Sequence, residues 1–362
     1  MKTINLSAGP NRLVATVQQR LLESAKAFPG TDIAAWETSH RTPLVHDAFD
    51  QCIALVREIL GVPKNFEVLF TQGGATGMFK AWPLNICPML RMVDIVRSGH
   101  WASEAYRALK EVEVGGVVRL GFEFDDWPSY RAINQGDFLY LVSNETVNGR
   151  QLPGWELLPQ DAPPLVVDMS SDIMTRPIDF SRVGMVFAST QKNLGMTGGF
   201  CLVIVRKDLM DCDPHPLLPA PLSFKEQMKH RGGLRNTVNP LVILSILFTL
   251  EWIKEQGGVE AMGAQTQERA QLLYDAIDGS NGHFEGLAPP DLRSNVNVTF
   301  RACDEARSED FLRFCADRGF VGLKGHAAWA KEVGPHARAS MYVGATTDDA
   351  TALVKAMNDF RS

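Results

Sequence analysis

Short apolar strands alternate with amphipathic helices between residues 14 and 257, and this order restricts the fold more than any other feature of the chain. Strands are expected at residues 67–71, 92–96, 117–120, 138–142, 165–167, 185–188 and 200–205. Helices are expected at residues 14–26, 47–60 and 240–256. Such alternation is typical of a mostly parallel α/β sheet with helices on both faces, in which ligands bind at the carboxyl ends of the strands.

The order of elements changes after Gly257-Gly258. From there the pattern predicts helix, strand (296–300), helix, strand (339–343) and helix, which is an α+β order. We therefore expect a large α/β domain at residues 15–257, and a smaller C-terminal α+β domain at residues 258–362 that also includes residues 1–14.

Composition indicates a globular protein that acts on small molecules. The chain has 362 residues, of which 45% are hydrophobic and 22% charged, and its net charge of -6 argues against a nucleic-acid surface. Residues 240–250 are too short an apolar run to span a membrane, and the N-terminus lacks the apolar core of a signal peptide. Six cysteines without a C-x-x-C pair indicate neither a zinc site nor a disulfide framework, so we expect a reduced, cytoplasmic protein: Cys52, Cys87, Cys201, Cys212, Cys303 and Cys315.

Two of the expected strands end in residues that carry chemistry. The strand at 165–167 runs into Asp168, and the strand at 185–188 is followed by Ser189-Thr190-Gln191-Lys192. Because about one crossover separates them, an acid and an amine would stand at neighbouring strand ends. A pyridoxal phosphate enzyme needs this pair, since the amine forms a Schiff base with the cofactor aldehyde and the carboxylate keeps the ring nitrogen protonated. A surface lysine and a surface aspartate on two loops explain the pair equally well.

A glycine-rich segment, Gly73-Gly74-Ala75-Thr76-Gly77, follows the strand at 67–71. It matches neither a P-loop nor a dinucleotide-binding loop, so it does not indicate nucleotide binding. Small residues between a strand and a helix leave backbone N–H groups free at the helix N-terminus for an anion such as a cofactor phosphate. A tight turn accounts for the glycines about as well.

Several short segments resemble the phosphoserine aminotransferase family, which belongs to class V of the fold type I pyridoxal phosphate enzymes. They occur in the family's order over nearly the whole chain. The segments are Asn5-Leu6-Ser7-Ala8-Gly9-Pro10, Ser39-His40-Arg41, residues 70–74 with Pro83-Leu84-Asn85, Ser143-Asn144-Glu145-Thr146, Asp168-Met169-Ser170-Ser171-Asp172 with Arg176-Pro177-Ile178-Asp179, Gln191-Lys192-Asn193-Leu194-Gly195, Arg235-Asn236-Thr237 and Gly322-Leu323-Lys324-Gly325-His326.

The resemblance implies a role for each matched residue at a pyridoxal phosphate site. Lys192 would be the Schiff-base lysine and the base that moves the substrate proton, and Asp168 would pair with the ring nitrogen. Trp101 would stack on the ring, and Thr146 would hydrogen-bond the ring 3-oxygen. The cofactor phosphate would be held by Ala75, Thr76 and Gln191, and by Asn236 and Thr237 of a second subunit.

The same resemblance implies how substrates bind. Arg338 would clamp the α-carboxylate. His326, together with His40 and Arg41 of the partner subunit, would hold the phosphate of phosphoserine or the distal carboxylate of glutamate. The functional unit would therefore be a homodimer with its active sites at the subunit interface.

The reaction implied is a ping-pong transamination between glutamate and 3-phosphohydroxypyruvate, which gives phosphoserine and 2-oxoglutarate in serine biosynthesis. Family members often also act on the phosphorylated hydroxythreonine of pyridoxine synthesis. Two features depart from the family: Ala327 stands where a basic residue usually follows the histidine of the Gly-His motif, and residues 327–337 differ in length and composition. Either Lys331 or His336 replaces that charge, or the pocket serves another acidic substrate.

Three alternatives to this reaction remain. The first is an aminotransferase for a sulfonate or phosphonate amino acid, which Ala327 suggests. The second is a fold type I enzyme such as a cysteine desulfurase, which would need a reactive loop cysteine. The third is a non-catalytic protein that keeps the fold.

Overall fold

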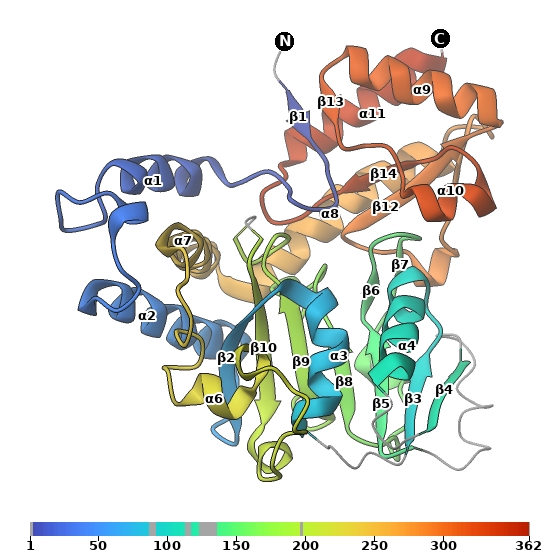
Figure 1. The fold of residues 1–362 in the computed structure, drawn as a ribbon. Coiled ribbons are helices and arrows are strands. Elements are labelled where there is room, and N and C mark those ends of the chain that lie inside the picture. Colours follow the sequence, from blue (N-terminus) through green and yellow to red (C-terminus); the bar gives the residue numbers. More distant parts are fainter. Residues whose placement is uncertain (1–2, 87–91, 113–116, 123–135, 196–197, 362) are drawn as a thin grey trace.

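A seven-stranded sheet forms the centre of the larger part of the molecule (Figure 1). The computed structural model describes residues 3–86, 92–112, 117–122, 136–195 and 198–361. The strand order is β2-β10-β9-β8-β5-β3-β4, and every strand is parallel to the others except β10, which is antiparallel to both of its neighbours. The strands are β2 (Phe66–Gln72), β3 (Met92–Val96), β4 (Val117–Phe122), β5 (Phe138–Val142), β8 (Leu165–Asp168), β9 (Val183–Ser189) and β10 (Phe200–Arg206). The predicted mostly parallel sheet is confirmed.

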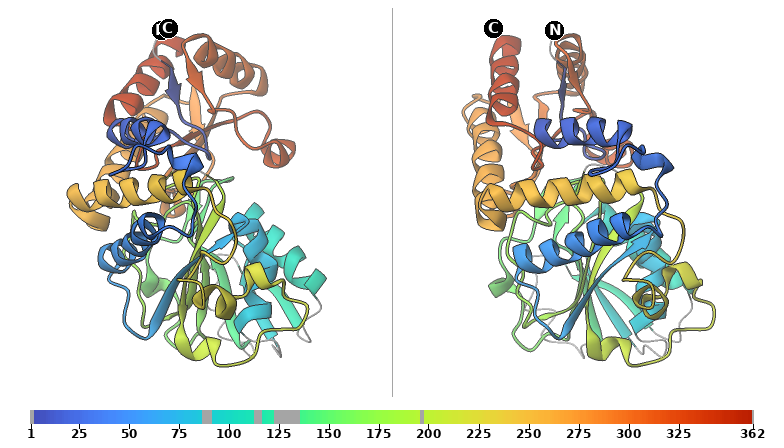
Figure 2. Two further views of the ribbon diagram at one scale, coloured as in Figure 1. Left: turned by 60° about the vertical axis from the view of Figure 1, so that its left-hand side comes forward. Right: turned by 90° about the vertical axis from the view of Figure 1, so that its left-hand side faces the viewer.

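Helices cover both faces of this sheet. On one face α7 lies between α1 and α2 (Figure 2), and on the other lie α3, α4 and α6. The helices are α1 (Ala15–Lys26), α2 (Pro43–Leu60), α3 (Gly74–Ile86), α4 (His100–Val112), α6 (Phe224–Met228) and α7 (Pro240–Glu255). Within the described ranges, no helix combines the length and apolarity needed to cross a membrane.

Two apolar cores hold these layers together, because successive side chains of a strand point to opposite faces of the sheet. In β9, Val186 and Ala188 pack into the core beneath α2 and α7, whereas Met185 and Phe187 pack into the core beneath α3 and α4. All of these side chains are buried. Burial on both faces explains why the strands read as continuous apolar runs in the sequence.

The C-terminal part has its own sheet and core, which include the N-terminus. Strand β1 (Ile4–Asn5) pairs in parallel with β13 (Phe320–Val321), and Leu6 is buried in the same core cluster as the C-terminal helices. The three-stranded antiparallel sheet has the order β11-β12-β14. The elements are α8 (Gly258–Asp278), β11 (Phe284–Gly286), β12 (Asn297–Ala302), α9 (Glu305–Asp317), α10 (Ala327–Val333), β14 (Ala337–Ser340) and α11 (Thr347–Arg361). The domain division at residues 257 and 258 stays a prediction.

The strand predicted at residues 339–343 is partly wrong, because β14 ends at Ser340. Met341, Tyr342 and Val343 are fully buried but leave the sheet. The N–H of Met341 donates to the Val296 carbonyl, and the N–H of Val343 donates to Asn193 Oδ1, next to Lys192. This run is apolar because Met341 packs into the C-terminal core and Tyr342 and Val343 pack into the core beneath α2 and α7. Apolar character alone does not distinguish such buried segments from a strand.

Candidate active site

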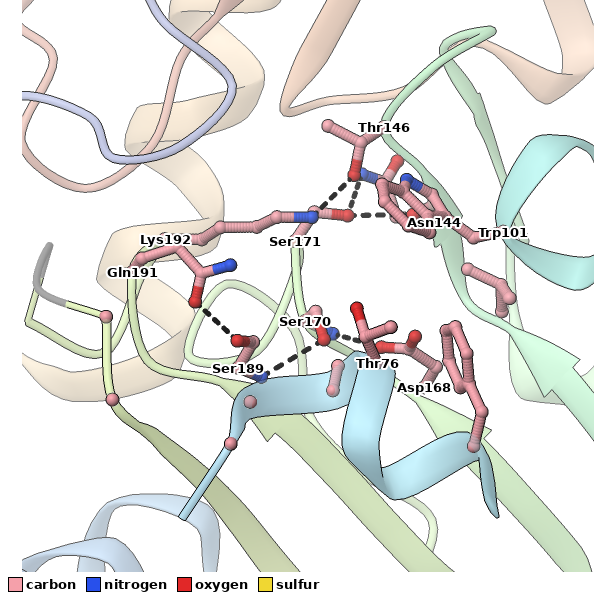
Figure 3. A pocket seen from close by; sticks show the side chains of 17 residues that line it. Thr76, Trp101, Asn144, Thr146, Asp168, Ser170, Ser171, Ser189, Gln191 and Lys192 are labelled. Atoms are coloured by element: carbon pink, nitrogen blue, oxygen red, sulfur yellow. Dashed lines mark hydrogen bonds between the residues drawn. The ribbon is translucent and has the colours of Figure 1, made fainter. Parts of the chain in front are cut away.

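The carboxyl ends of β2, β5, β8 and β9 and the start of α4 meet at a cavity of about 390 Å³ (Figure 3). Seven of the residues predicted from the sequence line it. They are Ala75, Thr76, Trp101, Thr146, Asp168, Gln191 and Lys192. Parallel strands and short strand-to-helix turns account for this convergence, since they bring residues far apart in the sequence to one edge of the sheet.

Lys192 is a buried amine that points across the cavity. Its side chain extends toward Thr146 and Trp101 (Figure 3), Nζ donates to Thr146 Oγ1 at 2.8 Å, and Nζ lies 5.8 Å from the Trp101 ring centroid. Burial, together with the charge of Arg338, lowers the pKa of Lys192 to about 8, although the carboxylates of Asp168, Glu145 and Asp172 oppose the shift. A lysine with this pKa is partly neutral near neutral pH, and a neutral amine is a nucleophile.

Asp168 is the buried acid of the same cavity. It ends β8, is only 4% exposed, and its Oδ1 accepts a hydrogen bond from the Ser170 N–H at 2.8 Å. Burial raises the pKa of Asp168, while hydrogen bonds from Ser170 and the charge of Lys192 oppose this. A cationic group placed beside Asp168 would favour the ionised form further, as a protonated ring nitrogen would.

Two serines that sequence reasoning missed connect the ends of β8 and β9. The Ser189 N–H donates to Ser170 Oγ at 3.0 Å, and the Ser189 hydroxyl donates to Gln191 Oε1. These bonds fix the cavity wall between Asp168 and Lys192 (Figure 3). Ser170 lies in one of the matched segments and Ser189 follows the strand predicted at 185–188, but serine is so common in turns that neither residue was assigned a role.

The first turn of α3 offers backbone donors to the cavity. Gly73 and Gly74 have φ of 100° and 67°, which non-glycine residues rarely adopt, and a Cβ on Gly74 would come within 3.1 Å of Ser189 Oγ. The helix begins at Gly74, so Ala75 and Thr76 belong to its first turn, whereas the sequence suggested that they lie in a loop before the helix. N–H groups of a first turn have no partner within their helix, and the helix dipole favours an anion there.

Arg338 and His326 lie beside the cavity but do not line it. Arg338 Nη1 contacts the Thr146 carbonyl at 3.4 Å, so the guanidinium lies behind the residue that bonds Lys192. Its Nε is buried without a hydrogen-bond partner in the part of the chain described. The His326 ring lies 4.8 Å from the His100 ring, and burial, followed by the charges of His100 and Arg338, lowers the pKa of His326.

Four further predicted residues lie away from this cavity: His40, Arg41, Asn236 and Thr237. His40 is buried just before α2, whereas Arg41 is exposed. The Thr237 carbonyl accepts from Gln72 Nε2 at 3.3 Å, and Asn236 Oδ1 is buried without a partner among the described residues. The sequence assigned all four to a partner's active site, and that assignment stays a prediction.

Residues 327–337, which differ from the family pattern, form a short helix and a buried histidine. His326 caps α10, because its Nδ1 accepts from the Ala328 N–H at 3.3 Å. Lys331 is exposed on this helix. His336 is 1% exposed and packs against the Trp329 ring and Gly325, so closely that a Cβ on Gly325 would lie 1.9 Å from its Nε2. Neither Lys331 nor His336 lines the cavity.

Comparison with known proteins agrees with this arrangement. The family model described as "Aminotransferase class-V" matches residues 3–353. The phosphoserine aminotransferase of Azotobacter vinelandii is 35% identical over 372 residues, which cover 99% of this chain and 98% of that protein. The phosphoserine aminotransferase of Bacillus subtilis is 33% identical over 99% of this chain and 98% of its own length.

Solved structures give the same result. The phosphoserine aminotransferase of Bacillus circulans subsp. alkalophilus matches with a TM-score of 0.89 and 34% identity, over 99% of this chain and 98% of that one. The enzyme of the same name from Trichomonas vaginalis, described as bound to PLP, matches with a TM-score of 0.89 and 30% identity over 99% and 100% of the two chains. This chain therefore belongs to the class-V aminotransferase family, whose fold is that of the fold type I pyridoxal phosphate enzymes.

Proposed function

We propose that this protein is a phosphoserine aminotransferase that uses pyridoxal phosphate. It would transfer the amino group of glutamate to 3-phosphohydroxypyruvate, which gives O-phosphoserine and 2-oxoglutarate in serine biosynthesis. The observation that carries the proposal is one cavity in which a buried lysine bonds Thr146 above a buried aspartate. The full-length relatives that bear this name support the choice of substrate.

The residues around the cavity fit pyridoxal phosphate. The first turn of α3 would hold the phosphate, Asp168 the ring nitrogen, and the Thr146 hydroxyl the ring 3-oxygen, while the Trp101 ring would cover one face. When bound, the cofactor supplies an aldehyde that takes the amino group and a ring that stabilises negative charge at the substrate Cα.

Lys192 performs the proton transfers. Its lowered pKa makes the neutral amine available as a base at the substrate Cα, and the Thr146 hydroxyl orients the amine. Asp168 would stay ionised beside a ring cation, and the Ser170 N–H that donates to its Oδ1 holds the carboxylate in place.

Substrate binding would require cations outside the cofactor site. Arg338 would clamp the α-carboxylate, since its guanidinium already lies against Thr146. His326, with His40 and Arg41 of a partner subunit, would hold the distal phosphate or carboxylate. The equivalent step on phosphorylated hydroxythreonine in pyridoxine synthesis uses the same groups, and it belongs to the proposal as a second activity.

The functional unit would be a homodimer in the cytoplasm. Large apolar side chains are exposed over the N-terminal helices, including Trp36, which is 61% exposed, and Ile33, which is 51% exposed. Large aromatic and aliphatic side chains that are exposed to this extent are common at interfaces between subunits. The five described cysteines are free thiols, as a reducing compartment would keep them, and Cys87 lies outside the described residues.

A second candidate is an aminotransferase for another acidic amino acid, such as a sulfonate or phosphonate. Ala327, the first residue of α10, favours it, because this exposed position brings no positive charge to the loop that carries His326. A sulfonate carries a single negative charge, less than a phosphate monoester, and would need fewer cations.

One spectroscopic experiment tests the cofactor, the lysine and the substrate together. The purified protein should show a visible absorption band that phosphoserine bleaches and that Lys192→Ala abolishes. The values of kcat/KM for phosphoserine, aspartate, cysteate and aminoethylphosphonate then rank the substrates. A higher value for any of the last three would replace phosphoserine as the substrate. A protein that shows no band even after pyridoxal phosphate is added would not be an aminotransferase.

A further inference from the structure

Glu145 is a buried carboxyl group beside the candidate active site for which the mechanism above has no use. Its side chain is fully buried, and it immediately precedes Thr146 in the chain. Few carboxyl groups are buried completely, because removing the charge from water costs several kcal/mol unless hydrogen bonds compensate. The contacts of Glu145 show where that compensation comes from.

Both oxygens of Glu145 accept hydrogen bonds from the start of α4. Oε2 accepts from the backbone N–H of Trp101 at 3.1 Å, and Oε1 accepts from the backbone N–H of Ala102 at 2.9 Å. Oε1 also accepts from the Ser98 hydroxyl at 3.1 Å. Glu145 thus caps α4 from a separate segment of the chain and places a negative charge where the helix dipole favours one.

The turn before α4 is packed tightly onto the same segment. A Cβ on Gly99 would lie 2.9 Å from Glu145 Cδ and 2.5 Å from Asn148 Nδ2. Asn148 Nδ2 in turn donates to the Ser98 carbonyl at 2.9 Å. The segment from Glu145 to Asn148 and the start of α4 therefore behave as one unit, with no room for either to move without the other.

This unit carries two groups that face Lys192. The Thr146 hydroxyl accepts from Nζ at 2.8 Å, and the Trp101 ring centroid lies 5.8 Å from the same atom. Trp101 is tied to Glu145 through its own backbone N–H, and Thr146 is the next residue in the chain. We propose that Glu145 is a positioning residue, which fixes the Trp101 ring and the Thr146 hydroxyl relative to each other and so sets the slot for the cofactor ring.

The charge of Glu145 supports this role. Burial raises the pKa of Glu145 to about 7, and the hydrogen bonds from Ala102, Trp101 and Ser98 oppose the shift. Its carboxylate also raises the pKa of Lys192, as does that of Asp168. Loss of the carboxylate would therefore make the Lys192 amine less basic as well as loosen the slot.

The inference rests on the proposed cofactor but not on the proposed substrate, so its test uses cofactor binding. Glu145→Gln keeps the size of the side chain but turns an NH2 group toward backbone N–H donors. We expect the affinity for pyridoxal phosphate to fall about tenfold or more, as for the loss of one hydrogen bond to a charged group. The visible circular dichroism of the bound cofactor should change. The fold decrease in kcat should be larger than the fold change in KM.

Two serine variants serve as the matched pair. Ser98→Ala removes one donor to Glu145 and should shift affinity and dichroism in the same direction by a smaller amount, which keeps the test open if Glu145→Gln does not fold. Ser103→Ala removes a hydroxyl that donates to Gly99 O at the same helix end without touching Glu145, and it should behave as wild type.

A folded Glu145→Gln protein with wild-type cofactor affinity and dichroism would overturn the inference, and so would equal effects of Ser98→Ala and Ser103→Ala. The proposed function fails differently. If the wild-type protein binds no pyridoxal phosphate, the function is wrong, and if it binds the cofactor but does not act on phosphoserine, only the substrate is wrong and the Glu145 result stands.

Discussion

The buried amine of Lys192 gives the site a defined response to pH. Its pKa is lowered to about 8 by burial, so the amine is mostly protonated below pH 8 and mostly neutral above it. Only the neutral amine attacks an aldehyde. The rate at which the apoprotein takes up pyridoxal phosphate, followed at the visible band, should therefore rise with pH and level off above about pH 8. A rate that keeps rising toward pH 10 would show that the amine keeps its ordinary pKa.

Asp168 is expected to affect the reaction more than cofactor binding. Asp168→Asn removes the negative charge beside the ring nitrogen, while α3, Trp101 and Lys192 remain. Breaking a buried charge pair costs about 3–5 kcal/mol, so kcat should fall about a hundredfold to a few thousandfold with the cofactor still bound. Ser170→Ala, which removes a hydrogen bond to the same carboxylate, should lower kcat by about tenfold. Equal kcat values for wild type and Asp168→Asn would remove Asp168 from the mechanism.

Single residues differ in how well the sequence predicts their surroundings. Asp168 ends β8 and Lys192 follows the end of β9 by three residues, so their convergence could be expected from the strand pattern. His336 was a candidate for the missing positive charge, yet its ring is packed against Trp329 and Gly325 just before β14. No property of a histidine in a sequence distinguishes a packed ring from a binding ring, since that depends on neighbours distant in the sequence.

Helix α2 is longer than the sequence predicted, and the capping of its first turn explains the difference. Helix α2 begins at Pro43 and not at residue 47, because Thr42 accepts from the Val45 N–H and proline suits the first helical turn. The apolar periodicity begins later than the helix itself, so periodicity alone places the start too late. Likewise, the apolar run of β10 gave no sign that this strand runs antiparallel, since buried strands of either direction are apolar on both sides.

The turn between β2 and α3 yields a prediction with its own control. Gly74→Ala would place a side chain at φ of 67° and bring a Cβ within 3.1 Å of Ser189 Oγ, so we expect a loss of about 1 kcal/mol or more in unfolding free energy and weaker cofactor binding. Gly77→Ala lies in the same helix with nothing within 4 Å of the new Cβ and should leave stability equal or up to about 1 kcal/mol higher. Urea unfolding measures both, and an equal effect of the two substitutions would contradict the strain at Gly74.

For the molecule as a whole, the sequence predicted the layers, but not the strand pairing that joins the N-terminus to the C-terminal part. Alternating strands and helices predict a sheet with helices on both faces, almost regardless of the exact bounds of each element. The pairing of β1 with β13, by contrast, joins residues more than three hundred positions apart through two short strands, Ile4–Asn5 and Phe320–Val321. Strands this short have no periodicity to read, and only the folded C-terminal core makes them pair.

The assembly of subunits would determine whether the active site is complete in one chain. Lys192 and Asp168 line the cavity, whereas Arg41 and Asn236 do not, although the family pattern assigns all four to one site. If two subunits share each site, mixing Lys192→Ala with Arg41→Ala subunits creates heterodimers in which one of two sites contains both intact residues. Random pairing makes half of the dimers mixed, so refolded mixtures should regain about a quarter of wild-type activity from two nearly inactive proteins. If Arg41 instead serves its own chain, every site in the mixture lacks one residue, and activity stays at the level of the separate variants.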